Sequence, residues 1–247
     1  MNKIIIVMEK IAIKGVIFDY GGTIDTNSRH WAEVLWEKYR ENEVPVEKSD
    51  FREAYVFGER SLAKFPYIKP EHNFRDVLHI KVDIQISNLI ENGKLDKALA
   101  EEHDYANKIA DACYDYVLRT LDRTRPVVKQ LSEKYKLVLV SNFYGNIETI
   151  LRDFSLYDYF SDIVESSVVG VRKPDPAIYR LGVEAMGLPA DEVLVVGDSF
   201  SKDVVPAKTV GCKVAWLKGE GWGNEEIDES VPDLIIEDLP QLLDYIY

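Results

Sequence analysis

The sequence predicts an α/β protein in which a doubly wound parallel sheet carries an inserted α-helical domain. In the first and last parts of the chain, short apolar runs alternate with helical stretches, which is typical of strands buried on both faces of a parallel sheet. This strand pattern disappears from Thr26 to about Arg125, where amphipathic helices follow one another. The predicted units are a core of residues 1–25 and 122–247 and a helical insertion of residues 26–121.

Six apolar runs are expected to form the strands of the core, and helices are expected between them. Proline is tolerated in the first turn of a helix, so Pro126 is expected to begin a helix that runs to Tyr135. Another helix is expected from Pro176 to Met186, ending at Gly187. The expected strands are Val16–Asp19, Leu137–Ser141, Ile163–Glu165, Val193–Gly197, Lys213–Leu217 and Leu234–Ile236.

The insertion is expected to contain several helices. The first carries Trp31 and further apolar residues at helical spacing. A second is expected to begin at Asp50, with Glu53 three residues later as its capping partner, and a later one to end near Gly93.

The first thirteen residues are more apolar than a free tail, but no targeting segment is expected there. The run Ile4–Met8 is interrupted by Glu9 and Lys10, so it is too short for a secretory signal or a membrane span, and a cytoplasmic protein is expected. Ile4–Val7 and Ile11–Ile13 fit either a hairpin leading into the first strand or an edge strand involved in association.

Composition restricts the partners. The 247 residues are 46% hydrophobic and 30% charged, as in ordinary globular enzymes, and the net charge is −13. Nucleic acids and anionic membranes require clustered Lys and Arg, so neither is expected as a partner. An anionic small substrate would depend on local positive groups and a metal ion. Cys113 and Cys212 match neither a disulfide framework nor a metal-ligand spacing.

Four segments carry polar residues at the ends of predicted strands or in loops. The carboxyl ends of parallel strands meet at one edge of the sheet, so Asp19, Ser141 and Asp198 are expected to converge. Each segment alone is a weak signal, but their order along the chain is specific. The segments are Val16–Asp25 with Asp19, Leu137–Asn142 ending in Ser141 and Asn142, Val171–Pro176 with Lys173, and Val193–Asp203 with Asp198 and Asp203.

In this order the segments resemble the motifs of the haloacid dehalogenase-type phosphatases. The resemblance extends from about Lys14 to the C-terminus, although between the first two motifs only length and helical character match. It implies a Rossmann-like core that does the chemistry and a helical cap that closes over the active site and selects the substrate.

The resemblance also implies roles for individual residues. Asp19 would be the nucleophile that forms an aspartyl-phosphate, and Lys173 would neutralise the charge on the nucleophile and the phosphoryl group. The phosphate oxygens would be bound by the Ser141 hydroxyl, the backbone amide of Asn142 and the backbone at Gly22.

A magnesium ion is the implied cofactor. Two carboxylates beside an anionic phosphate repel one another unless a cation intervenes, and Mg²⁺ favours hard oxygen ligands. The implied ligands are Asp19, the backbone carbonyl of Gly21 and Asp198, with Asp203 supporting the metal directly or through water.

The sequence departs from the family pattern at Gly21, where phosphatases carry a second Asp that protonates the leaving group and then activates water. Without that acid, a poor alkoxide leaving group should be handled badly. Three explanations are open: a substrate with a good leaving group, a cap residue that replaces the Asp, or slow hydrolysis that lets the phosphoenzyme accumulate.

The main prediction is a magnesium-dependent hydrolase of a small phosphorylated metabolite. One alternative is a binding or regulatory protein on a phosphatase scaffold. Another is a C–P bond hydrolase, because a phosphonate-cleaving branch has Ala at this position. That branch uses a cap lysine that forms an imine, and Lys64 or Lys69 is the candidate here, although no local motif supports either. A dehalogenase branch works without magnesium and is disfavoured by Asp198 and Asp203.

Overall fold

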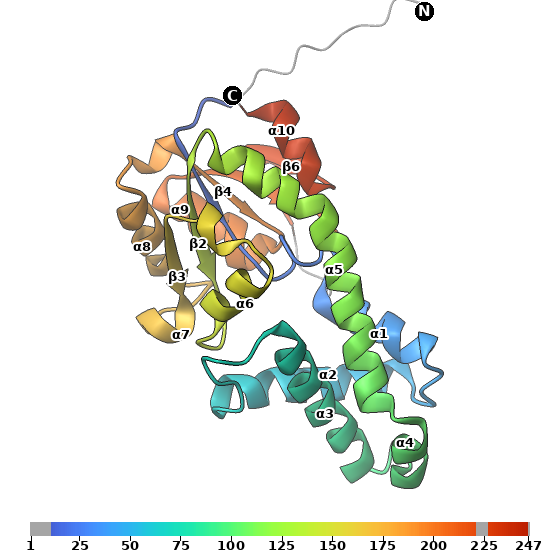
Figure 1. Ribbon diagram of the computed structural model, residues 1–247. Helices are drawn as coiled ribbons and strands as arrows, with labels where there is room; N and C mark the ends of the chain where they lie inside the picture. Colours follow the sequence, from blue (N-terminus) through green and yellow to red (C-terminus); the bar gives the residue numbers. More distant parts are fainter. Residues whose placement is uncertain (1–10, 221–226, 247) are drawn as a thin grey trace, which may run out of the picture.

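The computed structural model describes residues 11–220 and 227–246 and contains a six-stranded, fully parallel sheet of order β3-β2-β1-β4-β5-β6 (Figure 1). All six predicted strands are present, and their ends agree with the prediction to within one residue. The strands are β1 Gly15–Phe18, β2 Lys136–Ser141, β3 Asp162–Glu165, β4 Val193–Gly197, β5 Lys213–Leu217 and β6 Leu234–Ile236.

Successive residues of β1 enter two separate hydrophobic clusters, one on each face of the sheet. Val16 and Phe18 pack in one cluster, whereas Ile17 between them packs in the other. This alternation follows from the two-residue period of a strand, and burial of both faces explains the continuous apolar runs. β1 lies between β2 and β4, so its carboxyl end is central in the sheet.

Helices cover both faces of the core. The helix α8 ends, as predicted, at Gly187, which adopts a left-handed conformation with φ of 70°. Ile11 forms an isolated parallel bridge with Ile246, whereas Ile4–Val7 lies outside the described residues. The core helices and short helical turns are α6 Ile147–Asp153, η1 Tyr157–Tyr159, α7 Ser166–Val169, α8 Ala177–Met186, η2 Ala190–Glu192, η3 Phe200–Val204, α9 Val205–Val210, η4 Leu239–Gln241 and α10 Leu242–Tyr245.

The predicted insertion is helical throughout its regular elements, and its helices gather at one end of the molecule (Figure 1). One predicted boundary is wrong: the second helix starts two residues before Asp50, and its N-cap residue Glu47 makes no side-chain capping bond. The capping box of the insertion belongs instead to the third helix, where Asn73 and Asp76 exchange side-chain and backbone bonds. The helices are α1 Trp31–Glu41, α2 Lys48–Lys64, α3 Phe74–Glu91 and α4 Lys97–His103.

One long helix, α5 (Tyr105–Ser132), runs from the insertion into the core (Figure 1). The prediction that a helix begins at Pro126 is wrong, because Pro126 lies inside α5. Proline removes one helical hydrogen bond, but buried residues on both sides, among them Leu121 and Val128, pack the helix into the core. Tertiary packing therefore outweighs the local preference. The helix also continues across the predicted domain boundary between residues 121 and 122.

Candidate active site

The turn after β1 places Asp19 at the carboxyl edge of the sheet. The Asp19 amide donates to the carbonyl of Val196 at 2.9 Å, which continues the pairing of β1 with β4 for one more residue. Thr23 Oγ1 lies 3.3 Å from Asp19 Oδ2 and 3.4 Å from Asp198 Oδ1, so one hydroxyl contacts the carboxylates of both strands. The two segments meet here, as predicted.

Gly22 fills a place in this turn that only glycine can occupy. Its φ is +94°, and a Cβ atom there would lie 2.3 Å from Asp198 Oδ2. The Gly22 amide donates to Asp25 Oδ1 at 2.7 Å. The Gly22 amide therefore has an internal acceptor here, and its contact with a phosphate stays a prediction.

Lys173 joins two of the predicted acidic residues. Its Nζ lies 2.6 Å from Asp19 Oδ1 and 2.7 Å from Asp203 Oδ1. The Asn142 side chain holds the loop that carries it, accepting from the Lys173 amide at 2.8 Å and donating to the Lys173 carbonyl at 3.0 Å. Asn142 thus has a structural partner that the sequence did not reveal, while Ser141 lies buried at the end of β2.

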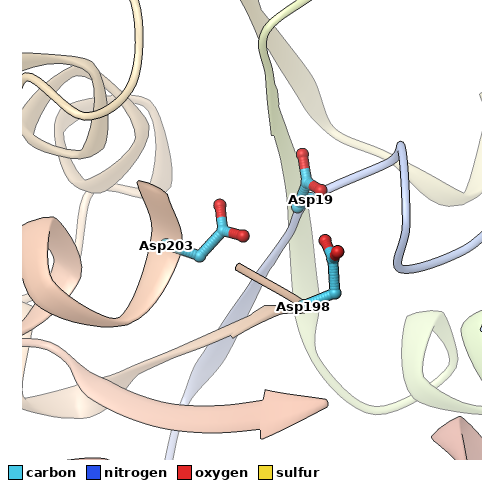
Figure 2. A group of neighbouring side chains, drawn as sticks. All are labelled: Asp19, Asp198 and Asp203. Atoms are coloured by element: carbon cyan, nitrogen blue, oxygen red, sulfur yellow. The ribbon is translucent and has the colours of Figure 1, made fainter. Parts of the chain in front are cut away.

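Asp198 follows β4, and Asp203 lies in the π-helical turn η3. Figure 2 shows their carboxylates converging with that of Asp19, and one ligand oxygen from each lies within 4.8 Å of the others. Asp203 is the most fully engaged, because besides Lys173 it accepts from the Tyr179 hydroxyl at 2.7 Å and the Ser199 amide at 2.9 Å. Tyr179, from α8, was not predicted as part of the site.

The charges in this cluster do not balance. Burial raises the pKa of Asp19 to about 6, against the opposing effect of Lys173. Burial, followed by repulsion from Asp203 and Asp19, raises the pKa of Asp198 well above its usual range. Although burial opposes it, attraction to Asp19 and Asp203 raises the pKa of Lys173, so this side chain stays an ammonium. One ammonium faces three carboxylates, and hard oxygen donors with excess negative charge fit a divalent cation such as Mg²⁺.

Gly21 faces open space. A Cβ atom built there meets no heavy atom within 4 Å, and the backbone of Gly21 lies outside the left-handed region. The residue also lines the cavity above the carboxylates. The cavity therefore has room for a Cβ atom at this position.

The cavity has a volume of about 930 Å³ and lies between the carboxyl edge of the sheet and the inserted helices. Lys64 lines it, whereas Lys69 is not among its lining residues. Sequence reasoning missed the buried Lys81, although a detectable signal existed: a lysine interrupts the apolar face of α3. The lining residues from the insertion include His30, Trp31, Tyr55, Glu59, Arg60, Phe65, Phe74 and Lys81.

Asp25 and His30 lie where the chain enters the insertion. Asp25 accepts from the Gly22 amide and, through Oδ2, from Trp31 Nε1 at 2.9 Å, so it ties the turn to α1. Burial raises the pKa of Asp25 to about 7. Burial, reinforced by the positive charge of Lys202, lowers the pKa of His30 to about 4. His30 is therefore a neutral imidazole near pH 7.

Known proteins resemble the chain in sequence and in fold. A family model described as haloacid dehalogenase-like hydrolase matches residues 13–211. The glyceraldehyde 3-phosphate phosphatase of Pyrococcus furiosus is 34% identical over 100 residues, which cover 40% of this chain and only 41% of that protein. A phosphoglycolate phosphatase of Vibrio vulnificus is 27% identical over 184 residues, covering 71% of this chain and 80% of that protein.

Solved structures agree on the fold. The HAD-hydrolase YfnB from Bacillus subtilis, solved bound to magnesium, superposes with a TM-score of 0.57 at 18% identity and covers 94% of this chain and 97% of that one. Within residues 11–220 and 227–246, no helix has the length and apolar character needed to cross a bilayer.

Proposed function

Because the chain belongs to the haloacid dehalogenase-like hydrolases, we propose that it is a magnesium-dependent phosphohydrolase acting on a small phosphorylated metabolite through an aspartyl-phosphate. The observation that carries this proposal is the buried 2.6 Å contact between Asp19 and Lys173, beside Asp198. A carboxylate held in place by an ammonium is a positioned nucleophile for phosphoryl transfer. The phosphatase names of the two relatives support this reaction class.

The reaction would proceed in two displacements. A carboxylate oxygen of Asp19 attacks phosphorus, and the bond between phosphorus and the leaving-group oxygen breaks. Water then attacks the phosphorus of the aspartyl-phosphate, which releases inorganic phosphate and restores the Asp19 carboxylate. Lys173 offsets the negative charge on the nucleophile and on the phosphoryl oxygens in both steps.

Asp19, Asp198 and the Gly21 carbonyl are the proposed ligands of magnesium, which when bound would screen the phosphate from the carboxylates. Asp203 supports the site from one side, because its oxygens already accept from Lys173, Tyr179 and the Ser199 amide. We propose that Asp203 mainly positions Lys173. Ser141 and the Asn142 backbone amide, at the end of β2, are the proposed phosphate-binding groups, and Asn142 also holds the Lys173 loop.

A second candidate function follows from Gly21. The missing acid is consistent with a binding or regulatory protein that holds magnesium and phosphate without turnover. A C–P bond hydrolase would need a cap lysine that loses its proton to form an imine. Of its two candidates, Lys64 lines the cavity and Lys69 does not, whereas the buried Lys81 lines the cavity but keeps its proton. Attraction to Glu59, acting against burial, raises the pKa of Lys81 well above its usual range.

The test is phosphate release from 4-nitrophenyl phosphate, with and without magnesium, for the native chain and for Gly21→Asp. Metal-dependent release by the native chain, abolished in Asp19→Asn, supports the phosphohydrolase. The open space at position 21 makes Gly21→Asp a fair comparison, because the added Cβ atom meets no heavy atom within 4 Å.

The two candidate functions separate in the same experiment. Release by Gly21→Asp alone would support the binding protein, whereas no release by either chain would contradict the phosphohydrolase. Acid quenching of the native enzyme would also detect an accumulated phosphoenzyme, as expected when hydrolysis of the aspartyl-phosphate is slow.

A further inference from the structure

The insertion places one buried positive charge against the active-site cavity. Lys81 lies on the apolar face of α3, and its side chain is only 9% exposed, yet it lines the cavity that contains Asp19 and Gly21. A charged side chain is rarely buried on an apolar helix face without a partner or a use. The burial of Lys81 beside Asp19 and Gly21 therefore points to a use in the cavity.

The contacts of Lys81 are one carboxylate and two aromatic rings. Its Nζ lies 2.8 Å from Glu59 Oε1, 5.8 Å from the centre of the Trp31 ring and 6.0 Å from that of Tyr144. The Tyr144 hydroxyl in turn lies 3.4 Å from Glu59 Oε2. Ring faces attract a cation, so these groups hold the ammonium at a fixed place in the cavity wall.

The groups that contact Lys81 are linked to the loop after β1 and to the loop after β2. On one side, Trp31 donates to Asp25, and Asp25 accepts from Gly22, next to Gly21 in the turn after β1. On the other side, Tyr144 closely follows Ser141 and Asn142 in the loop after β2. Lys81 is thus connected to the loop of the nucleophile and to the loop of the proposed phosphate-binding groups.

The charge state of Lys81 fits an electrostatic role. Burial opposes its charge, but Glu59, Tyr144 and Tyr55 raise the pKa of Lys81 well above its usual range, so it remains an ammonium. At the same time Gly21 offers no acid to the departing oxygen, and the space there is open. The cavity therefore has a fixed cation in its wall and no acidic side chain at position 21.

We infer that Lys81 is a catalytic residue of the proposed phosphohydrolase and that its ammonium stabilises the leaving-group oxygen. As Asp19 attacks, the P–O bond breaks and the bonding electron pair stays on the leaving oxygen, which becomes anionic. Lys81 donates a hydrogen bond to this oxygen and keeps its proton, and solvent protonates the released product. Glu59 is a positioning residue that holds the ammonium in the wall.

The inference rests on the proposed function. The role of Lys81 is tested with a series of phosphate esters that differ in their leaving groups. We would measure kcat/KM, which covers the step in which the leaving group departs, for phosphate esters from 4-nitrophenyl phosphate to phenyl and alkyl phosphates. Neutralising the pair in Glu59→Gln/Lys81→Met avoids leaving a buried unpaired charge. Lys69→Met removes an exposed lysine that does not line the cavity and is the control.

The expected result is a loss that grows with the basicity of the leaving group. The double variant should lose only a few-fold on 4-nitrophenyl phosphate but about 100-fold or more on alkyl phosphates, the scale of one transition-state hydrogen-bond donor. Adding Gly21→Asp to it should restore much of the alkyl activity, because the new carboxyl group supplies a proton. Lys69→Met should match the native chain.

Three results would overturn the inference, and they differ in what else they affect. An equal loss across the whole series, or no loss, would show that Lys81 acts only in packing, while the phosphohydrolase would stand. Absence of metal-dependent release by the native chain from every ester would overturn the proposed function and the role of Lys81 together. Thermal unfolding of each variant separates lost catalysis from lost folding.

Discussion

Two adjacent glycines in the turn after β1 have opposite surroundings. Gly21 faces the open cavity, whereas Gly22 is pressed against the Asp198 carboxylate and adopts a positive φ. Only Gly22 is therefore required by the backbone and by close packing. The residue at position 21 is free to vary in size, so its identity bears on chemistry and not on folding.

This difference gives a matched pair of variants. Gly21→Ala should fold with the stability of the native chain to within about 0.5 kcal/mol, as expected for a substitution without new contacts. Gly22→Ala should lose about 1 to 3 kcal/mol, because it strains the backbone and forces the Asp198 carboxylate aside. Urea unfolding of both variants measures this, and equal stabilities would contradict the geometry of the turn.

At the scale of elements, the N-cap of α1 carries a pH-dependent contribution to stability. His30 Nδ1 accepts from the Ala32 amide at 3.2 Å, and burial lowers the pKa of His30 to about 4. In the unfolded chain the imidazole takes up a proton near pH 6.5. Protons therefore favour the unfolded state, and stability falls as the pH drops from about 6.5 toward 4.

The predicted size of this effect is about 2 kcal/mol between pH 7 and pH 5. His30→Asn keeps an acceptor at the N-cap but does not titrate, so its stability should fall less over this interval by about that amount. The free energy of unfolding in urea at the two pH values measures the difference. Parallel pH profiles for the two proteins would mean that His30 titrates normally.

The close packing of α8 on the sheet gives another prediction at this scale, for the stability of a variant. A Cβ atom at Gly182 would lie 2.7 Å from Val140 Cγ2 and 3.1 Å from Ile17 Cδ1. Gly182→Ala should therefore destabilise the protein by about 1 to 3 kcal/mol through overpacking, despite the better helix propensity of alanine. The helix can approach β1 and β2 only because this side chain is absent.

Gly58 in α2 is the control for this packing. A Cβ atom there would lie 3.3 Å from Cγ of the buried Gln85, which is a milder contact than the 2.7 Å at Gly182. Gly58→Ala should therefore be close to neutral, because the better helix propensity of alanine offsets this contact. Thermal unfolding of both variants tests the pair, and a stabilised Gly182→Ala would contradict the predicted contact with the sheet.

For the whole molecule, charge is the dominant constraint on the site. The chain carries a net charge of −13, and its three convergent carboxylates add a local excess of negative charge. The insertion and the core also meet around this site, through bonds such as Asn146 Nδ2 to the His72 carbonyl at 2.8 Å and Thr149 Oγ1 to the Pro70 carbonyl at 2.6 Å. Binding of a cation should therefore stabilise the whole fold.

Removal of one carboxylate should abolish most of this stabilisation by the metal. Without magnesium at pH 8, Asp198→Asn should melt above the native chain, because it removes a carboxyl group whose charged form is disfavoured by burial and by repulsion from Asp203 and Asp19. A gain of about 1 kcal/mol corresponds to about 2 to 4 °C. With magnesium at about 100 times its Kd, the native chain should gain about 2.7 kcal/mol and the variant little.

Thermal melts with magnesium and with a chelator measure both effects. A native chain whose melting temperature does not change with magnesium would contradict the proposed metal site. An Asp198→Asn variant that melts lower without metal would contradict the predicted repulsion among the carboxylates.

Much of the fold and of the site was predictable from local patterns and from topology. The six strands follow from apolar runs, because a strand buried on both faces leaves a continuous apolar signature. The meeting of Asp19, Ser141 and Asp198 at one edge follows from parallel strands, whose carboxyl ends share that edge. Both inferences need only the order of residues along the chain.

The sequence by itself therefore determined the sheet, the helical insertion and the set of acidic and basic residues at the edge of the sheet. Only the tertiary structure decided that Pro126 lies within α5, that Asn142 holds the Lys173 loop, and that Lys81 of the insertion faces the active site. The physical reason is that these outcomes depend on contacts between residues far apart in the chain. Local periodicity gives the face on which a side chain lies, but the packing of separate elements decides what that face meets.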